Sequence, residues 1–365
     1  MNNNHTQEKQ PLIHITKRAV LPTKITLAIR LGAIFLGLVF SLIVVTILTG
    51  KDPISVFGSM FTGAFGTELR IWNLLNETAI LLGISLALTP AFKMKFWNCG
   101  AEGQVLVGGL TTATCMLFLG EVLPLPVLFI VMIISSMLAG AIWAVIPSIF
   151  RAFFGTNETL FTLMMNYIAT SLVALCLKVW VKSGSGVLVA MPQYKFPTLF
   201  GQDYFLNVIV VLAICALMYI YLKYSKNGYE IAVVGESENT AKYVGINVKK
   251  VVIRTMVISG LICGLVGLLL VANGSCTITT GIVGGRGFTG IMVAWLAKFN
   301  PVIMIASSFL VAFLTRGSKQ ISTDLRLPSS IGEIITAIIL LFLIGCEFFI
   351  NYKVHIRLPE KEEEK

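Results

Sequence analysis

Long apolar runs separated by short polar segments make up most of the chain. A helix needs about 20 apolar residues to cross a bilayer, and most of these runs approach that length. Ten runs can be counted, at residues 29–48, 72–92, 101–119, 125–149, 159–181, 205–224, 251–272, 288–299, 302–316 and 331–350. The eighth is short, which indicates a broken or tilted helix. The pattern predicts an all-α polytopic membrane protein with about ten transmembrane helices.

The composition agrees with the pattern and excludes several other classes. Of the 365 residues, 56% are hydrophobic and only 13% are charged, whereas a soluble domain has about 25% charged residues. The net charge of +10 comes from cations in the joints between runs, where they fix orientation and contact lipid head groups instead of nucleic acid. Seven scattered cysteines and three histidines form no metal-ligand spacing. Residues 285–290 match G-x-G-x-x-G but have no strand before them and no acidic residue about 20 positions after them, so we reject a dinucleotide site. No P-loop or hydrolytic motif is present, so we expect neither an enzyme nor a cofactor.

The distribution of cations predicts the orientation. Residues 1–28 are polar and basic and precede an uncleaved signal anchor, so we place them in the cytoplasm. Cations then mark further cytoplasmic joints at Lys93, Arg151 and Lys298. Residues 29–350 would form the transmembrane domain and residues 351–365 a charged cytoplasmic tail, so that both termini lie inside. Two expected external segments, 178–195 and 316–326, also carry cations and depart from the rule.

Two glycine-rich motifs place charge at the ends of apolar runs. Gly-Ala-Glu-Gly at residues 100–103 contains Glu102 and is followed by Gln104, and Gly-Gly-Arg-Gly at residues 284–287 contains Arg286. Ionisable groups at membrane depth cost about 2.5–3.5 kcal/mol on insertion scales, so they commonly serve a pathway. Glu102 and Arg286 are 184 residues apart, about half the chain. This offset predicts an inverted repeat of two five-helix halves.

Polar side chains also follow one face of the fifth run. Glu158, Thr162 and Asn166 recur every four residues and therefore share a helical face. That face must avoid lipid, and it either lines a pathway or forms hydrogen bonds between helices. Glu77, near the outer end of the second run, is either a pathway residue or a solvated carboxylate.

A polar segment at residues 225–250 is the longest cytoplasmic joint. It predicts a short helix at Asn239–Val244 that ends at Gly245 and needs a partner surface for stability. The segment is therefore either a docking site for a cytoplasmic protein or an ordinary loop. In the seventh run, Gly260, Gly264 and Gly267 have the spacing that allows two helices to approach closely.

Five motifs in order resemble those of ABC-importer permeases for simple sugars and nucleosides, the branched-chain amino acid and ribose-like family. They are Trp97–Gln104, Gly155–Ile168, the stretch from Gly228 to Asn247, Ser259–Gly267 and Gly287–Ala294. The Asn-Glu pair at residues 157–158 is most similar to the longer of two nucleoside-importer permeases. Cys99 and residues 298–301 depart from the family pattern, and the second departure leaves the substrate open.

The resemblance implies a permease of a bacterial cytoplasmic membrane that moves a nucleoside or a related small polar solute by alternating access. It implies three partners: a second related permease, a cytoplasmic ATP-binding subunit that hydrolyses ATP, and an external substrate-binding lipoprotein. Residues expected to couple to the ATPase are Gly228, Tyr229, Asn239, Ala241, Lys242 and Gly245. Residues expected along the substrate pathway are Glu77, Glu102, Gln104, Glu158, Thr162, Asn166 and Arg286.

Two alternatives stay open at this point. The same machine could carry riboflavin or a simple sugar, because the external binding protein sets much of the selection. A protein of another class, a proton-coupled secondary transporter, would use Glu77 or Glu158 as its proton carrier.

Overall fold

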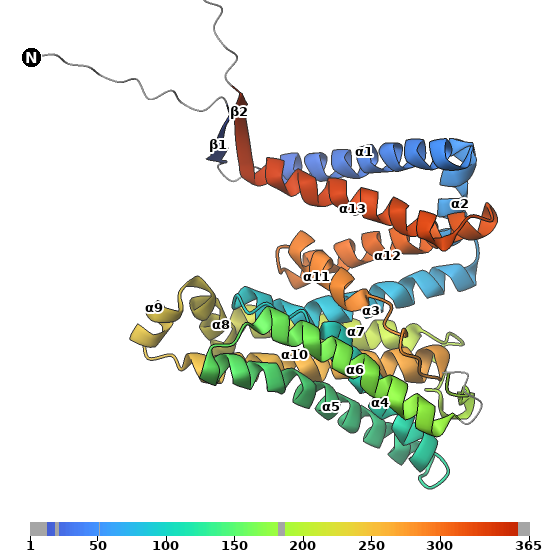
Figure 1. Ribbon diagram of the computed structural model, residues 1–365, viewed down its shortest axis with the longest axis vertical. Coiled ribbons are helices and arrows are strands. Elements are labelled where there is room, and N and C mark those ends of the chain that lie inside the picture. The colour runs from blue at the N-terminus through green and yellow to red at the C-terminus, as the bar shows by residue number, and fades with distance from the viewer. Residues whose placement is uncertain (1–12, 19–21, 51, 182–186, 357–365) are drawn as a thin grey trace, which may run out of the picture. The chain divides into compact units, whose positions relative to one another are not determined.

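The computed structural model describes residues 13–18, 22–50, 52–181 and 187–356, and most of them are helical (Figure 1). By its internal contacts the chain divides into two compact units. The larger is Ala64–Phe313, and the smaller combines Met1–Gly63 with Leu314–Lys365. The expected charged tail falls largely on residues 357–365, outside the described residues.

The larger unit is a bundle of helices. Its elements are α3 (Glu68–Lys93), α4 (Ala101–Leu119), α5 (Leu125–Phe154), α6 (Glu158–Trp180), the 3₁₀ turn η1 (Pro192–Tyr194), α7 (Phe205–Tyr224), α8 (Lys226–Glu236), α9 (Glu238–Tyr243), α10 (Val248–Leu270), the π-helical turn η2 (Val271–Ser275), α11 (Arg286–Leu296) and the first half of α12 (Pro301–Asp324). Helix α10 packs against α3, α4 and α5, and α3 packs against α7 and α11. Helices α8 and α9 lie together at one end of this bundle (Figure 1).

Nine helices in the described part of the chain are long and apolar enough to cross a membrane. They correspond to nine of the ten expected runs. The expected eighth span is different, because α11 has only 11 residues, about 16 Å at 1.5 Å per residue. The sequence had also assigned no helix to Pro53–Phe65, which forms the short helix α2.

The segment from Cys276 to Phe299 nevertheless runs from one end of α3 to the other. Just before its start, Asn273 of η2 donates to Asn207 at 3.0 Å, and Asn207 donates to Asn76 in the first half of α3 at 2.7 Å. At its end, the ring of Phe299 stacks on Phe92 near the last residue of α3, with 6.1 Å between the ring centroids. A loop followed by α11 therefore extends along α3 in place of the expected eighth span.

Small residues allow α10 to approach its neighbours closely. A Cβ added at Gly264 would lie 2.1 Å from the carbonyl oxygen of Ser136 in α5. A Cβ at Gly260 would lie 2.4 Å from the carbonyl oxygen of Gly140, and one at Gly267 would lie 2.2 Å from that of Val105 in α4. These distances leave no room for a side chain, so the three glycines set the spacing of α10 against α4 and α5.

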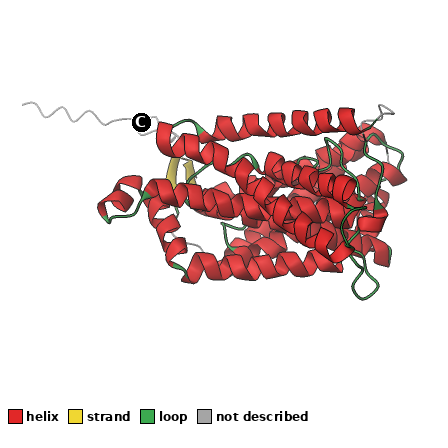
Figure 2. Cartoon of the chain, turned by 90° about the horizontal axis from the view of Figure 1, so that it is seen from below, coloured by secondary structure: helices red, strands yellow, loops and turns green. Residues whose placement is uncertain are grey.

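The smaller unit contains β1 (Ile13–Lys17), α1 (Thr23–Thr49), α2, the second half of α12, α13 (Ser329–Asn351) and β2 (Tyr352–Ile356). Helices α1 and α13 pack along each other, and Arg30 of α1 forms an ion pair with Glu347 of α13. Strands β1 and β2 pair antiparallel, with Ile13 opposite Ile356 and Lys17 opposite Tyr352 (Figure 2). The pattern of apolar runs does not predict this two-stranded sheet.

Candidate functional site

Helix α11 begins against the side chain of Glu102. Gly284 and Gly285 have φ angles of 62° and 77°, in the left-handed region that favours glycine, and they turn the chain into the helix. The first N–H groups of a helix have no partner within it. Here the Gly285 N–H donates to Glu102 Oε1 at 2.8 Å and the Gly287 N–H donates to Glu102 Oε2 at 2.7 Å. The helix dipole adds to this stabilisation, so the two glycine-rich motifs of the sequence form one site.

The close approach of α11 to its neighbours requires small residues. A Cβ at position 287 would lie 2.5 Å from the backbone nitrogen of Glu102, and one at Gly290 would lie 2.7 Å from the side chain of Ile84 in α3. Ser85 also donates a hydrogen bond to the Gly290 carbonyl at 3.0 Å. These contacts place the start of α4, which contains Glu102, close to the middle of α3.

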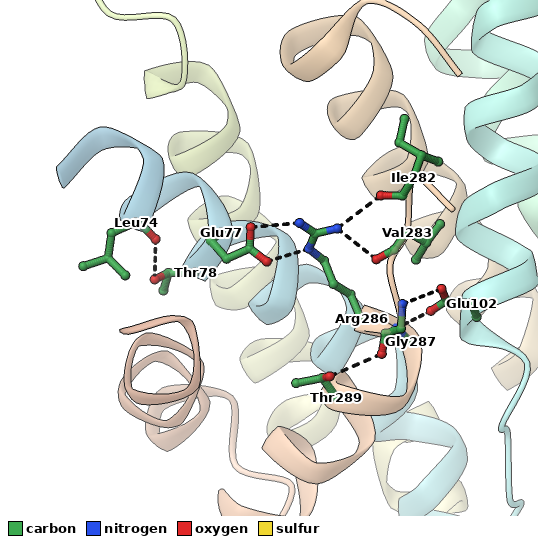
Figure 3. Close-up of polar contacts among 10 residues, drawn as sticks. Leu74, Glu77, Thr78, Glu102, Ile282, Val283, Arg286, Gly287 and Thr289 are labelled. Carbon is green, nitrogen blue, oxygen red and sulfur yellow. Dashed lines mark hydrogen bonds and ion pairs between the residues drawn. The ribbon is translucent and has the colours of Figure 1, made fainter. Parts of the chain in front are cut away.

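Arg286, the first residue of α11, points away from Glu102 towards α3 (Figure 3). Its Nε donates to Glu77 Oε1 at 2.6 Å and its Nη2 donates to Glu77 Oε2 at 3.0 Å. Its Nη1 donates to the carbonyl oxygens of Ile282 and Val283 at 3.2 and 2.9 Å. The paired side chains are 7% exposed for Glu77 and 23% for Arg286. This bidentate geometry is the strong form of an arginine–carboxylate contact.

The polar face of α6 binds the backbone that leads into α4. The Cys99 N–H donates to Thr162 Oγ1 at 3.2 Å. Asn166 accepts from the Gly103 N–H at 2.8 Å and donates to the Cys99 carbonyl at 2.9 Å. The sequence left two interpretations open for this face, a pathway lining or hydrogen bonds between helices. The contacts of Thr162 and Asn166 are hydrogen bonds from α6 to the segment that leads into α4.

Asn98 connects the same segment to α10 and α4. It is fully buried, it donates to Ser259 of α10 at 3.2 Å, and its Oδ1 accepts from the Gly100 N–H at 3.0 Å and from Gln104 at 3.2 Å. The Oε1 atom of Gln104 is buried and has no hydrogen-bond partner within the described residues. Such an orphaned acceptor can take a hydrogen bond from a solute or a water molecule.

Glu158 lies at the other end of the α6 face. Arg151, in the last turn of α5, places its Nε 3.3 Å from Glu158 Oε2 and its Nη2 3.6 Å from Glu238 Oε1 of α9. The sequence assigned Arg151 only an orienting charge. Its contacts join α5, α6 and α9.

The segment around α8 and α9 combines a packed base with an exposed tip. A Cβ at Gly235 would lie 2.1 Å from the carbonyl oxygen of Lys93, and Glu230 of α8 pairs with Arg254 of α10 at 2.9 Å. Ala241 and Gly228 are buried, whereas Asn239 and Lys242 are exposed. The aromatic rings at the tip face outward, because Tyr229 is 63% exposed and Tyr243 is 92% exposed. Gly245 ends the segment with a φ of 83°.

The structure therefore gathers the expected pathway residues into neighbouring groups. Glu77, Glu102 and Arg286 meet at the start of α11, and Gln104, Thr162 and Asn166 surround residues 98–103. Glu158 is apart from them and pairs with Arg151. The sequence pattern did not single out Asn98 or the chain of amides that runs from the half-buried Asn76 through the buried Asn207 to the buried Asn273. Asparagines inside or beside apolar runs, including one within the first motif, were the available signal.

The comparison with protein families decides the class of the chain. The family described as "Branched-chain amino acid transport system / permease component" matches residues 70–344. The chain belongs to this family. The match begins near the start of α3 and ends within α13, so it covers the whole site of this permease.

Curated relatives align with the permease over most of their length. A guanosine ABC transporter permease protein of Bacillus subtilis is 28% identical over 87% of this chain and 92% of its own. A nucleoside ABC transporter permease protein of Lactococcus lactis subsp. cremoris is 25% identical over 91% and 93%. A glucose ABC transporter permease protein of Haloferax volcanii is 26% identical over 85% of each chain.

Proposed function

We propose that this permease is one of two related membrane subunits of an ATP-driven importer that carries nucleosides across the cytoplasmic membrane. The observation that carries the proposal is the family match, together with two relatives named for guanosine and nucleoside transport that align along nearly the whole chain. ATP hydrolysis would occur in a separate cytoplasmic subunit. An external substrate-binding lipoprotein would deliver the solute.

The chemistry of the site supports a neutral, hydroxyl-rich solute. Glu77 is neutralised by Arg286, and Glu102 is held by two backbone N–H groups at a helix start. The remaining polar groups are amides and hydroxyls, such as Gln104 and Thr162, which suit a nucleoside because it both donates and accepts hydrogen bonds. We infer that the residues Glu77, Glu102, Gln104, Thr162, Asn166 and Arg286 form a gate on the pathway, held closed here by their mutual contacts.

The exposed tip of α8 and α9 supports docking of the ATP-binding subunit. A six-residue helix such as α9 is not stable alone. Here α9 rests on a packed base and presents Lys242 and Tyr243 outward, and Tyr229 of the neighbouring α8 is exposed beside it along the chain. Large exposed aromatic side chains are typical of protein interfaces. Gly228, Asn239, Ala241 and Gly245 would shape this docking segment.

A sugar cargo is the second candidate, because the relative named for glucose aligns at a similar identity. A proton-coupled carrier has less support. Glu77 and Glu158 would be its proton carriers, and each is paired with an arginine.

Uptake of radiolabelled guanosine tests the proposal in cells that carry or lack this gene, with restoration from a plasmid as the control. We expect uptake to be lost on deletion and competed by unlabelled nucleosides, and not by ribose or riboflavin. If guanosine uptake were unchanged and ribose or riboflavin uptake were lost, the protein would still be an importer subunit, but its substrate would be ribose or riboflavin. No change for any of the three solutes would refute the proposed substrate class.

A further inference from the structure

Arg151 occupies the one described position where α5, α6 and the docking helix α9 are joined by charge. Its guanidinium faces Glu158, whose side chain is 13% exposed, and Glu238, whose side chain is 52% exposed. Arginine presents its donors as a rigid fork and can therefore hold two carboxylates in fixed directions. A displacement of α9 thus reaches the first turn of α6 through one side chain.

The contacts continue along a single face of α6. Thr162, one turn after Glu158, donates to the Glu158 carbonyl at 2.7 Å and accepts from the Cys99 N–H at 3.2 Å. Asn166, one turn further, accepts from the Gly103 N–H at 2.8 Å and donates to the Cys99 carbonyl at 2.9 Å. A helix is stiff along its axis, so these three residues move together.

Packing leaves little slack between α6 and the segment it holds. A Cβ at Gly100 would lie 3.1 Å from the Cβ of Thr162, and one at Gly103 would lie 2.9 Å from the Oδ1 of Asn166. Glu102 lies between these glycines and holds the start of α11 through the N–H groups of Gly285 and Gly287. The contacts are therefore continuous from α9 to α11.

We propose that Arg151 is a positioning residue for transport: it transmits movement of α9 to α6, and α6 then moves residues 99–103 and releases or restores the Glu102 contact with α11. This proposal rests on the proposed docking of an ATP-binding subunit on α9. In this proposal Thr162 and Asn166 connect α6 to residues 99–103, and the contact that breaks is the one between Glu102 and the start of α11.

The proposal is testable because the ion pairs of Arg151 should contribute little to the stability of the fold. Ion pairs near a surface contribute little to folding, so replacing Arg151 should leave the bundle intact while it removes the link. The protein to use is the complete transporter, co-expressed with its native partner subunits and reconstituted in liposomes. The variants are Arg151→Gln, the charge-retaining Arg151→Lys, and Lys353→Gln as a control at an exposed cation in β2, outside the docking segment.

We expect Arg151→Gln to lower the number of solute molecules imported per ATP by about three- to tenfold, a typical range for residues that modulate coupling. ATP hydrolysis and subunit assembly should stay close to the wild-type values. Arg151→Lys should give an intermediate ratio and Lys353→Gln the wild-type ratio. Glu158→Gln combined with Arg151→Gln should be no worse than Arg151→Gln alone, because both remove the same contact. An unchanged ratio in Arg151→Gln, or additive losses in the double variant, would overturn the proposal.

Hydrogen exchange provides a second measurement that does not depend on the cargo. In the wild-type complex, ATP should change the exchange of the amides at Gly103, Gly285 and Gly287, and in Arg151→Gln this ATP-dependent change should disappear. The same change in both proteins would refute transmission through Arg151, even if the imported solute proves to be a sugar. Failure of the ATP-binding subunit to co-purify with the wild-type chain would instead refute the proposed function and this inference with it.

Discussion

Charged residues at membrane depth are matched within the protein at the start of α11. Arg286 donates two hydrogen bonds to Glu77, and Glu102 accepts two from backbone N–H groups. Removing a charge from water costs free energy, and the attraction between two opposite charges offsets that cost only while both charges are present. The pair is therefore expected to behave differently when one member or both are replaced.

The first prediction follows from this asymmetry. Glu77→Ala leaves Arg286 without its carboxylate and should destabilise the protein by about 3–5 kcal/mol, as expected for breaking a buried pair. The double variant Glu77→Gln with Arg286→Gln removes both charges and should lose less. Thermal unfolding in detergent measures the difference, with Glu121→Gln at an exposed carboxylate as the control. A double variant less stable than Glu77→Ala would contradict the prediction.

The second prediction concerns the cap of α11. Glu102→Gln keeps one acceptor oxygen but loses the charge, and hydrogen bonds to charged groups contribute about 1.5–3 kcal/mol. The amides of Gly285 and Gly287 should therefore exchange at least about tenfold faster, as hydrogen exchange with mass spectrometry can measure. Equal exchange in Glu102→Gln and wild type would show that the cap does not hold the helix start.

Helices in a bilayer associate through close packing of small residues, because lipid is as apolar as the side chains. Helix α10 illustrates this, since its glycines lie against backbone atoms of α4 and α5. Its sequence spacing alone was enough to predict a seam. The partner helices could not be predicted, because they depend on which surfaces the other helices offer.

The third prediction tests that seam. Gly264→Ala places a Cβ where the Ser136 carbonyl oxygen lies 2.1 Å away, so α10 and α5 must separate. We expect a loss of about 1–3 kcal/mol, the usual cost of overpacking. Gly345→Ala, in α13, is the matched control because a Cβ there meets nothing within 4 Å. Equal unfolding temperatures for the two variants would contradict the packing argument.

Element existence was largely predictable, and contacts were not. Long apolar runs predicted nine helices that the structure contains, because membrane helices satisfy their own backbone. The four-residue spacing of Thr162 and Asn166 predicted their common face. The partner of that face, the backbone of Cys99 and Gly103, depends on a non-helical segment whose course no periodicity records. The contact of Glu102 with α11 was likewise invisible, because it joins residues 183 and 185 positions apart.

The orientation of the chain in the membrane decides which segments lie in the cytoplasm and which lie outside. We propose that α9 lies in the cytoplasm, because the polar segment that contains it is rich in cations, and that residues 187–203, one crossing earlier, lie outside. Two exposed positions report on these sides, since Tyr243 is 92% and Val189 is 79% exposed.

The fourth prediction uses these positions in a chain whose native cysteines are replaced. A membrane-impermeant maleimide should label Val189→Cys on intact cells and should label Tyr243→Cys only after the cells are permeabilised. The reverse pattern would invert the proposed orientation. Labelling of both positions on intact cells would place α9 and residues 187–203 on the same side, which would contradict the number of crossings between them.

The pairing of β1 with β2 limits the number of times that the chain can cross the membrane. Two strands that share backbone hydrogen bonds lie on one side of a membrane, because an open sheet cannot stand in lipid. The chain between β1 and β2 must therefore cross an even number of times. The described residues contain nine helices long enough to cross, which is an odd number. If each of the nine crosses once, parity requires the segment that ends in α11 to cross as well, and it requires α2 to stay on one side.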